Sequence, residues 1–336
     1  MKQPAQRTDM ISMCRDALAT LVGAAMLCGE IAVAQDYPSR PVSIVVPIAA
    51  GTGMDILTRL YAEQLSQALG KPVIVENRPG AGLTLAPGSV SAAPADGYTL
   101  MVAVTGTFAT FPVLYKKLSY APDDFRPIAV YVKSPFVLVA NPDLPVRSAT
   151  DFIKLAKEKT PPLTYSTPGS GTMQHLAMEA MKQMFHFDMT QVPYRNTGQS
   201  VTDVAAGHVS MGIAEAGASV PLIKEGKLRA LAVTSATRLP ALPDVPPLAE
   251  AANAPGFEAV SWHALVAPSG TPPEIIQRLH AEMKRIMAAP EITRRITQLG
   301  LIPFDMSSVA DMQAYIKSDQ EKWGSMVRGL KLEGTQ

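Results

Sequence analysis

Residues 42–55 (VSIVVPIAAGTGMD) constrain the fold more than any other part of the chain. The stretch begins with an apolar run that has no polar alternation, which is typical of a strand buried on both faces of a parallel sheet. Small residues follow at positions 49–53, and apolar residues then recur at helical spacing until Gly70. The stretch therefore predicts a buried strand, a glycine-containing loop and a helix N-terminus, in that order.

A loop of this kind presents free backbone N–H groups at the positive end of a helix dipole, and this combination can bind an anion. The simpler interpretation, in which the glycines only make a tight turn, stays open at this stage. The same arrangement recurs at residues 163–176, where a short strand is followed by a Gly-rich polar loop and a helix. The repetition predicts two similarly built lobes that face one another.

Strands and helices alternate along the chain, which predicts an α/β fold with parallel strands joined by right-handed crossovers. Ligands in such folds bind beyond the carboxyl ends of the strands, where the small polar loops lie. We expect further strands at residues 72–76, 98–104, 135–140, 209–215, 228–234 and 259–267. We expect helices at residues 151–159 with Thr150 as N-cap, from Thr271 with a proline-led start, and at residues 305–327.

The first 34 residues have the features of a secretory signal peptide. A positively charged region precedes an apolar run at residues 17–28 that is too short to span a bilayer, and residues 32–34 (AVA) fit a cleavage site. We therefore expect cleavage near Ala34 and a periplasmic protein. Both cysteines, Cys14 and Cys28, lie in this leader, so the mature chain would have no disulfide, cysteine nucleophile or thiolate metal site.

The composition argues against several classes of function. The formal net charge of the 336-residue chain is +1, and no basic patch marks a nucleic-acid surface. No segment after the leader is long and apolar enough to cross a membrane. The histidines show no metal-ligand spacing, so we expect no metal and no cofactor. We expect His186, His208, His263 and His280 in the core or on the surface, and Trp262 and Trp323 in packing roles.

Eight short segments match sequence motifs of one protein family, in the same order and at similar spacing. They are residues 37–55, 71–82 (KPVIVENRPGAG), 96–100 (DGYTL), 165–176 (YSTPGSGTMQHL), 192–198 (VPYRNTG), 226–235 (GKLRALAVTS), 239–251 (LPALPDVPPLAEA) and 267–283 (APSGTPPEIIQRLHAEM). Together they resemble the Bug-type (Bordetella uptake) receptors, the periplasmic solute-binding proteins of tripartite tricarboxylate transport systems. The resemblance covers essentially the whole mature chain.

This resemblance implies a two-lobed periplasmic-binding-protein fold of type II (Venus flytrap), with a parallel-type sheet in each lobe. The expected division is residues 35–135 for the first part of lobe 1, 136–235 for lobe 2 and 236–336 for the return to lobe 1. The implied protein is a monomeric receptor without catalytic residues. It holds a small carboxylate through backbone N–H groups and small hydroxyl side chains, without an arginine clamp, and delivers it to membrane permease subunits.

Positions carried over from the family give a candidate ligand site. Lobe 1 would contribute Gly51, Thr52, Gly53, Met54, Asp55, Thr105, Gly106 and Thr107, and lobe 2 would contribute Ser170, Gly171, Thr172, His175, Tyr194, Arg195 and Glu215. Three of these have a second interpretation. Asp55 could serve the first turn of its helix, Arg195 could be a solvated or interlobe charge, and His175 could lie outside the cleft.

Two departures from the family pattern bear on the ligand. Thr52 stands where the family commonly has glycine, so a side chain would enter the anion-binding loop. The family often has an aspartate that aligns with Ala214, and here the acid is lost or shifted to Glu215. A ligand amino group that relied on this aspartate would lack its acidic partner. Met54 would add an apolar surface to the site. These departures favour a carboxylate with an apolar body, for which an aromatic ring is one candidate.

Three other functions can be weighed against a receptor. An exported hydrolase of small carboxylic esters could use Ser170, but the nucleophile-elbow pattern fails at Pro168 and no base–acid set surrounds it. A nucleotide enzyme built on Gly51 and Gly53 lacks the third glycine, because Ile56 stands there. The effector domain of a regulator would share the fold, but the leader and the missing helix-turn-helix argue against it.

Overall fold

The computed structural model describes residues 37–194, 197–304 and 308–336. The predicted signal peptide and its cleavage site lie outside these residues. Residues 40–336 form one unit, and the fold described here is the fold of that unit. None of the described helices is both long enough and apolar enough to span a bilayer.

The described residues form one ten-stranded sheet with the order β2-β1-β3-β9-β4-β7-β5-β6, and β8 and β10 also pair with β4. The strands are β1 (Val42–Val46), β2 (Val73–Asn77), β3 (Thr99–Val104), β4 (Phe125–Ala140), β5 (Leu163–Thr167), β6 (Met189–Pro193), β7 (Met211–Glu215), β8 (Arg229–Val233), β9 (Val260–Pro268) and β10 (Ile302–Pro303).

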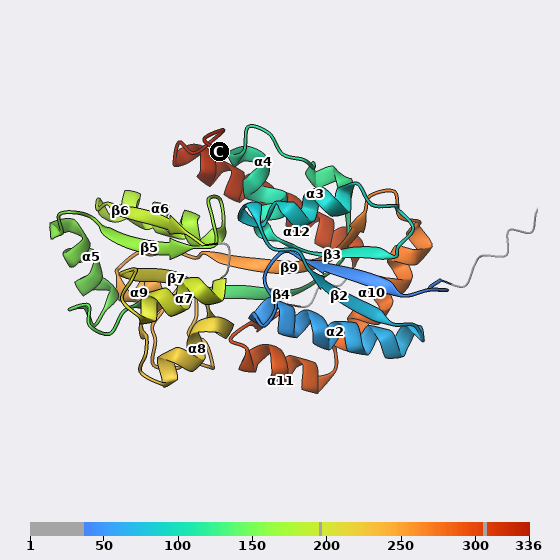
Figure 1. The fold of residues 1–336 in the computed structure, drawn as a ribbon, viewed down its shortest axis with the longest axis horizontal. Helices are drawn as coiled ribbons and strands as arrows, with labels where there is room; N and C mark the ends of the chain where they lie inside the picture. Colours follow the sequence, from blue (N-terminus) through green and yellow to red (C-terminus); the bar gives the residue numbers. More distant parts are fainter. Residues whose placement is uncertain (1–36, 195–196, 305–307) are drawn as a thin grey trace, which may run out of the picture. The chain divides into compact units, whose positions relative to one another are not determined.

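Helices cover both parts of this sheet (Figure 1). They are α2 (Gly53–Leu69), α3 (Leu85–Ser91), α4 (Phe111–Leu114), α5 (Ala149–Glu158), α6 (Met173–Phe185), α7 (Thr197–Ala205), α8 (Ala216–Lys224), α9 (Leu248–Ala251), α10 (Pro273–Met287), α11 (Pro290–Gln298) and α12 (Val309–Gly329). Short 3₁₀ helices lie at Ala81–Leu83 and Pro122–Asp124, and one π-helical turn at Gly106–Thr110 precedes α4.

The sheet has two parallel groups of strands, one in each lobe, as predicted. In lobe 1, β1 lies between β2 and β3 and is parallel to both, and in lobe 2, β5 lies between β6 and β7 in the same way. The antiparallel strands β4 and β9 join the two groups (Figure 1). Each lobe therefore has a mixed sheet, because the chain crosses between lobes on extended strands rather than on loops.

Strand β4 is much longer than the sequence predicts. The prediction covered residues 135–140, but the strand begins at Phe125 and has 16 residues. Its first part pairs with β9 and its last part, Phe136–Ala140, pairs with β7. The sequence analysis missed this first part because Pro127 weakens a strand prediction. In the structure, the pairing of β4 with β9 is irregular just after Pro127.

Several helix ends follow the predicted chemistry. Helix α2 ends at Gly70, whose φ of 67° is the left-handed conformation that glycine adopts without strain. Helix α10 starts at Pro273, as the proline-led pattern predicts. The predicted N-cap at Thr150 is wrong. The N-cap of α5 is Ser148, whose hydroxyl accepts a hydrogen bond from the Asp151 N–H, and Thr150 already lies inside the helix.

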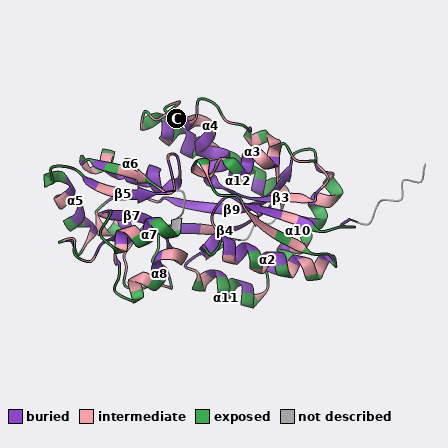
Figure 2. Ribbon diagram, viewed as in Figure 1, coloured by how far each residue is buried: buried purple, intermediate pink, exposed green. Residues whose placement is uncertain are grey.

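The buried residues shown in Figure 2 form separate apolar clusters on the faces of the sheet. Trp262 is fully buried in a lobe 1 cluster together with Phe108 and Met312, and Trp323 is buried in another cluster, as their predicted packing roles require. Leu248 and Phe257 belong to the same cluster as Phe152 of α5. The same cluster also contains Trp323 of α12, so the expected return to lobe 1 at residue 236 stays a prediction.

Candidate functional site

A narrow chamber lies where α2, the turn before α4, α6 and the end of β7 meet. Its volume is about 30 Å³, which is room for about two water molecules. The lining residues are Ile48, Met54, Leu83, Val104, Gly106, Phe111, Phe136, Pro168, Thr172, Met173, Gln174, Glu215, Ser261 and His263. Most of the wall is apolar, and none of the described lysines and arginines lines it. The described walls would therefore hold an anion through uncharged donors.

The lobe 1 loop is fixed by three side-chain hydrogen bonds. Thr52 is the N-cap of α2, and its hydroxyl accepts from the Asp55 N–H and donates to the Ala49 carbonyl. The Asp55 carboxylate accepts from the Gly51 N–H at 2.8 Å. The Thr52 side chain therefore serves its own loop as a cap instead of entering an anion site, and the Gly51 amide is already occupied.

The lobe 2 loop repeats this arrangement residue for residue. Thr172 is the N-cap of α6, and its hydroxyl accepts from the His175 N–H and donates to the Gly169 carbonyl. The His175 Nδ1 accepts from the Gly171 N–H at 3.1 Å. In both loops, the third helical residue therefore reaches back to the glycine before the cap and holds the loop closed.

These caps leave the next amides of each helix free to bind a ligand. The first backbone hydrogen bond of α2 runs from the Ile56 N–H to the Thr52 carbonyl, and that of α6 runs from the Leu176 N–H to the Thr172 carbonyl. The amides before these residues have no partner within their helices. Met54 of α2 and Met173 and Gln174 of α6 carry such amides and line the chamber. Two helix N-termini thus point their partial positive charge at one cavity.

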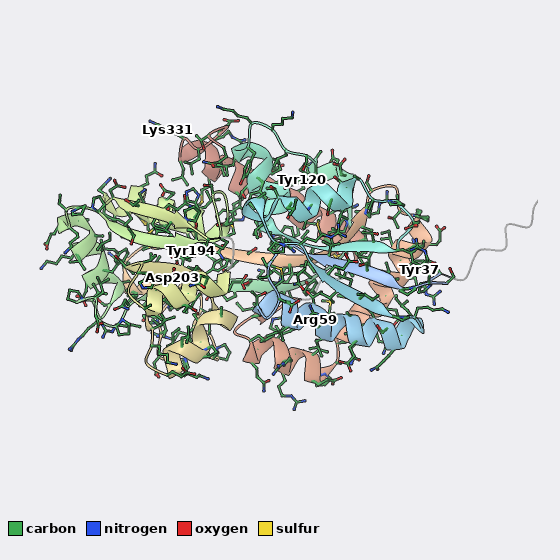
Figure 3. All side chains as sticks on the ribbon, in the orientation of Figure 1. Tyr37, Arg59, Tyr120, Tyr194, Asp203 and Lys331 are labelled. Carbon is green, nitrogen blue, oxygen red and sulfur yellow. The ribbon has the colours of Figure 1, made fainter. Side chains whose placement is uncertain are left out.

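Asp55 does not line the chamber and is anchored by contacts with Arg59 and Asn77. Its carboxylate contacts Arg59 at 3.0 Å and accepts from the Asn77 amide at 2.9 Å (Arg59 is labelled in Figure 3). Burial acts to raise the Asp55 pKa, but the hydrogen bonds from Arg59, Gly51 and Asn77 outweigh burial and hold the pKa below its usual value. These contacts support the helix-terminus role for Asp55 over direct ligand contact.

His175 is a neutral positioning residue in this geometry. Its side chain is buried, and burial lowers its pKa despite the Glu179 carboxylate at 4.0 Å from Nε2. Because Nδ1 accepts a hydrogen bond from the Gly171 amide, the ring proton of the neutral form lies on Nε2. His175 therefore shapes the loop and does not line the chamber.

Glu215 brings a carboxyl group into the chamber at the junction of β7 and α8. It is the last residue of β7 and the N-cap residue of α8, and 9% of it is exposed. Burial raises its pKa to about 7. The neighbouring Ala214 packs into an apolar cluster. Position 215, and not position 214, thus contributes to the lining of the chamber.

His263 is a chamber residue that the sequence analysis placed only among core or surface histidines. It lies on β9 opposite Val104 of β3 and Val132 of β4, is 1% exposed, and lines the chamber. Its Nδ1 has no hydrogen-bond partner among the described residues. Burial lowers its pKa to about 3, so the ring is neutral near pH 7. Its wall position depends on strand register, which no local motif signals.

The predicted ligand residues take up different positions in the structure. Met54, Gly106, Thr172 and Glu215 line the chamber. Gly51, Thr52, Asp55, Gly171 and His175 form the capped loops, while Gly53 adds a free amide at the start of α2. The Thr105 hydroxyl accepts from the Trp262 N–H, and the Thr107 hydroxyl accepts from the Val104 N–H, so both hold the β3 end in place. Arg195 lies outside the described residues.

Ser170 and Tyr194 line a second, wider groove. This outer groove has a volume of about 730 Å³ and shares Ile48, Leu83 and Pro168 with the chamber, so the two spaces adjoin. The Tyr194 hydroxyl donates to Asp203 at 2.7 Å, and Figure 3 shows the two residues close together. The groove offers room for the body of a ligand whose polar head occupies the chamber.

Close contacts between the lobes depend on glycine. A Cβ atom at Gly169 would lie 3.0 Å from the Gly82 Cα, and one at Gly217 would lie 3.3 Å from the Gly53 Cα. The Thr110 hydroxyl also donates to the Gly171 carbonyl at 2.6 Å. The lobes therefore meet backbone to backbone around the chamber, with no side chains between them at these points.

The site offers hydrogen-bond donors and a carboxyl group but no metal-binding set. Within the described residues, no three histidine, cysteine, aspartate or glutamate side chains gather so that they could hold a metal ion. The sequence analysis did not anticipate the apolar wall residues Phe111 and Phe136, or Ser261 and Gln174. These side chains come from four separate elements and meet only through the tertiary fold.

Comparison with known proteins agrees with this architecture. The model of the tripartite tricarboxylate transporter family receptor matches residues 57–332. BugT of Bordetella pertussis is 30% identical, and the alignment covers 89% of this chain and 93% of BugT. The structure titled R. palustris Rpa4515 with adipate superposes with a TM-score of 0.82 at 34% identity, covering 88% of this chain and 98% of that one.

A second solved structure has the same fold. MatC (Rpa3494) from Rhodopseudomonas palustris with bound malate gives a TM-score of 0.80 at 30% identity, and covers 87% of this chain and all of that one. The predicted resemblance and two-lobed fold are therefore confirmed, and the hydrolase alternative is not supported, because the relatives are receptors. This chain belongs to the Bug-type receptors of the tripartite tricarboxylate transporter family.

Proposed function

We propose that this protein captures a small carboxylate between its two lobes in the periplasm and presents it to membrane permease subunits. One observation carries the proposal: the N-termini of α2 and α6 meet at a chamber whose lining, as far as the chain is described, includes no lysine or arginine. A carboxylate accepts hydrogen bonds from free amides and is stabilised by the helix dipoles, so it needs no arginine or lysine. No bond of the ligand is broken in this function.

The ligands of two relatives and the apolar wall of the outer groove together indicate a class of ligand. Rpa4515 and MatC carry adipate and malate, which are both dicarboxylates. Ile48, Leu83, Leu85 and Tyr115 give the outer groove, where the body of the acid would lie, a largely apolar wall, which supports an acid with an apolar body. We therefore propose that saturated or aromatic acids bind better than small, highly hydroxylated ones.

Closure of the lobes would signal to the permease that the receptor has bound a ligand. A ligand favours the closed state only by the difference between its affinities for the closed and the open state. The amides that would hold the carboxylate come from both lobes, so only the closed form offers them together. We propose that the protein acts as a monomer after export and cleavage near Ala34.

A thermal-shift screen of the exported, processed protein tests this proposal. The panel contains mono-, di- and tricarboxylates, aromatic acids and amino acids, with adipamide as the uncharged match for adipate. A ligand at one hundred times its dissociation constant stabilises the folded state by about 2.7 kcal/mol, which corresponds to a shift of about 4 °C for a chain of this size. A shift with one class of acid and none with adipamide supports the proposal, whereas no shift with any acid contradicts it.

A further inference from the structure

Glu215 is a buried acid for which the described residues supply no counter-charge. Its side chain lines the chamber at the N-terminus of α8, and Phe136 lies opposite it on β4. Among the described residues, its carboxyl group has no hydrogen-bond or ion-pair partner. A carboxylate that is buried without a partner is strongly disfavoured, so such a group binds a proton or recruits a partner from the ligand.

The titratable groups that the structure describes at the chamber and its loops do not supply a positive charge to Glu215. His263 on β9 is neutral near pH 7, because burial lowers its pKa to about 3. His175 on α6 is also kept neutral by burial and is hydrogen-bonded to the Gly171 amide. Asp55 on α2 is engaged by Arg59. Glu215 is therefore the chamber group that changes charge near neutral pH, since its pKa is raised to about 7.

The size of the chamber determines which part of a ligand can meet Glu215. A volume of about 30 Å³ accepts a carboxylate head but not the body of an acid, which must extend into the outer groove of about 730 Å³. The head then lies among the free amides of α2 and α6 and the carboxyl of Glu215. Two ionised carboxylates would repel each other there, because the described wall of the chamber includes no lysine or arginine.

Resting on the proposed function, we propose that Glu215 meets the ligand in its protonated form and donates its O–H hydrogen bond to the ligand carboxylate, so that binding takes up one proton from solution. The unpartnered Nδ1 of His263 adds a neutral imidazole to the same chamber. Glu215 thus selects acids whose carboxylate has no ammonium group beside it. An α-amino acid would place its ammonium group beside Glu215 and would instead favour the ionised form.

The sign of the pH dependence follows from this proton. Binding is strongest at a pH where Glu215 is already protonated, and it weakens as the pH rises through the pKa of Glu215 in the ligand-free receptor. With half-protonation near pH 7, the dissociation constant rises about tenfold between pH 6 and pH 8. An amino acid that binds the ionised carboxylate would show the opposite trend.

The test measures the dissociation constants of adipate, benzoate and any stronger acid of the thermal-shift panel at pH 6, 7 and 8. Benzoate does not itself titrate in this range, so its trend reports the protein. We expect the tenfold loss in wild type and a flat profile in Glu215→Gln, whose amide donates at every pH. Glu225→Gln, at the other end of α8 in an exposed ion pair with Lys227, should keep the wild-type profile.

Calorimetry of the wild type in two buffers with different ionisation enthalpies gives a second test, which does not need the variant to fold. At pH 8 we expect about 0.9 protons taken up per bound acid, and at pH 6 about 0.1. Acids that bind with a flat pH profile and no proton uptake would overturn this inference alone. Failure of every acid to bind at every pH would overturn the proposed function and this inference with it.

Discussion

Replacing Gly217 by alanine tests whether the glycine contacts belong to a ligand-closed state. Gly217 lies in the first turn of α8, and its φ is outside the left-handed region, so the backbone accepts alanine. The new Cβ would lie 3.2 Å from the Leu299 carbonyl oxygen and 3.3 Å from the Gly53 Cα. Both neighbours are backbone atoms and cannot rotate away as a side chain can.

The same substitution should have opposite effects on stability and on affinity. With the lobes apart, a glycine-to-alanine change stabilises the folded chain by about 0.4–1 kcal/mol, because it restricts the unfolded chain. With the lobes closed, the tight contacts cost about 1–3 kcal/mol. Since binding requires closure, Gly217→Ala should weaken carboxylate binding by about 5- to 100-fold.

The assay compares unfolding of the ligand-free protein with the dissociation constant of a panel acid. Gly329→Ala is the matched control, because Gly329 is also helical and a Cβ there would meet no atom within 4 Å. The control should keep wild-type affinity. If Gly217→Ala binds as tightly as wild type, or if the ligand-free protein loses as much stability as the complex, then the contact with Gly53 is not specific to the closed state, and the argument is wrong.

Two further changes test the capped loops. Asp55→Asn should destabilise the protein by about 1.5–3 kcal/mol at pH 7 through loss of the charged hydrogen bonds. Because the pKa of Asp55 is lowered in the folded state, this stability difference is present above the unfolded-state pKa and should vanish as the pH falls through the folded-state pKa. Urea titrations at several pH values measure the difference. Thr172→Ala should cost about 1 kcal/mol of stability and weaken acid binding, whereas Thr172→Ser should restore both; equal stability of the two variants would contradict the cap.

Much of the fold could be predicted because its signals are local. The apolar run before Pro47, the glycine at position 70 and the proline at position 273 each act within a few residues, and the strand and helices start or end as predicted. Strand β6 and helix α8 carry weaker local signals, and the sequence analysis did not define them. Helix α8 contains Gly217 and Pro221, two residues that lower any helix prediction.

The chamber wall could not be predicted from local signals, because it depends on register between distant strands. His263 faces the chamber only because β9 pairs with both β3 and β4. A shift of one residue would turn its ring to the other face of the sheet. Glu215 is a similar case, since position 214 enters the core and position 215 enters the chamber.

The two capped loops explain how a receptor can hold an anion without lysine or arginine at the site. In each loop, a threonine hydroxyl and the side chain of the third helical residue together fix the glycine before the cap. The loop amides are therefore held in position before the ligand arrives, and binding has less conformational entropy to remove. No lysine or arginine of the described residues lines the chamber, so nothing described there would compensate an ionised Glu215. The loops as the proposed anion site and Glu215 as its proposed pH-sensitive part both follow from this one feature of the wall.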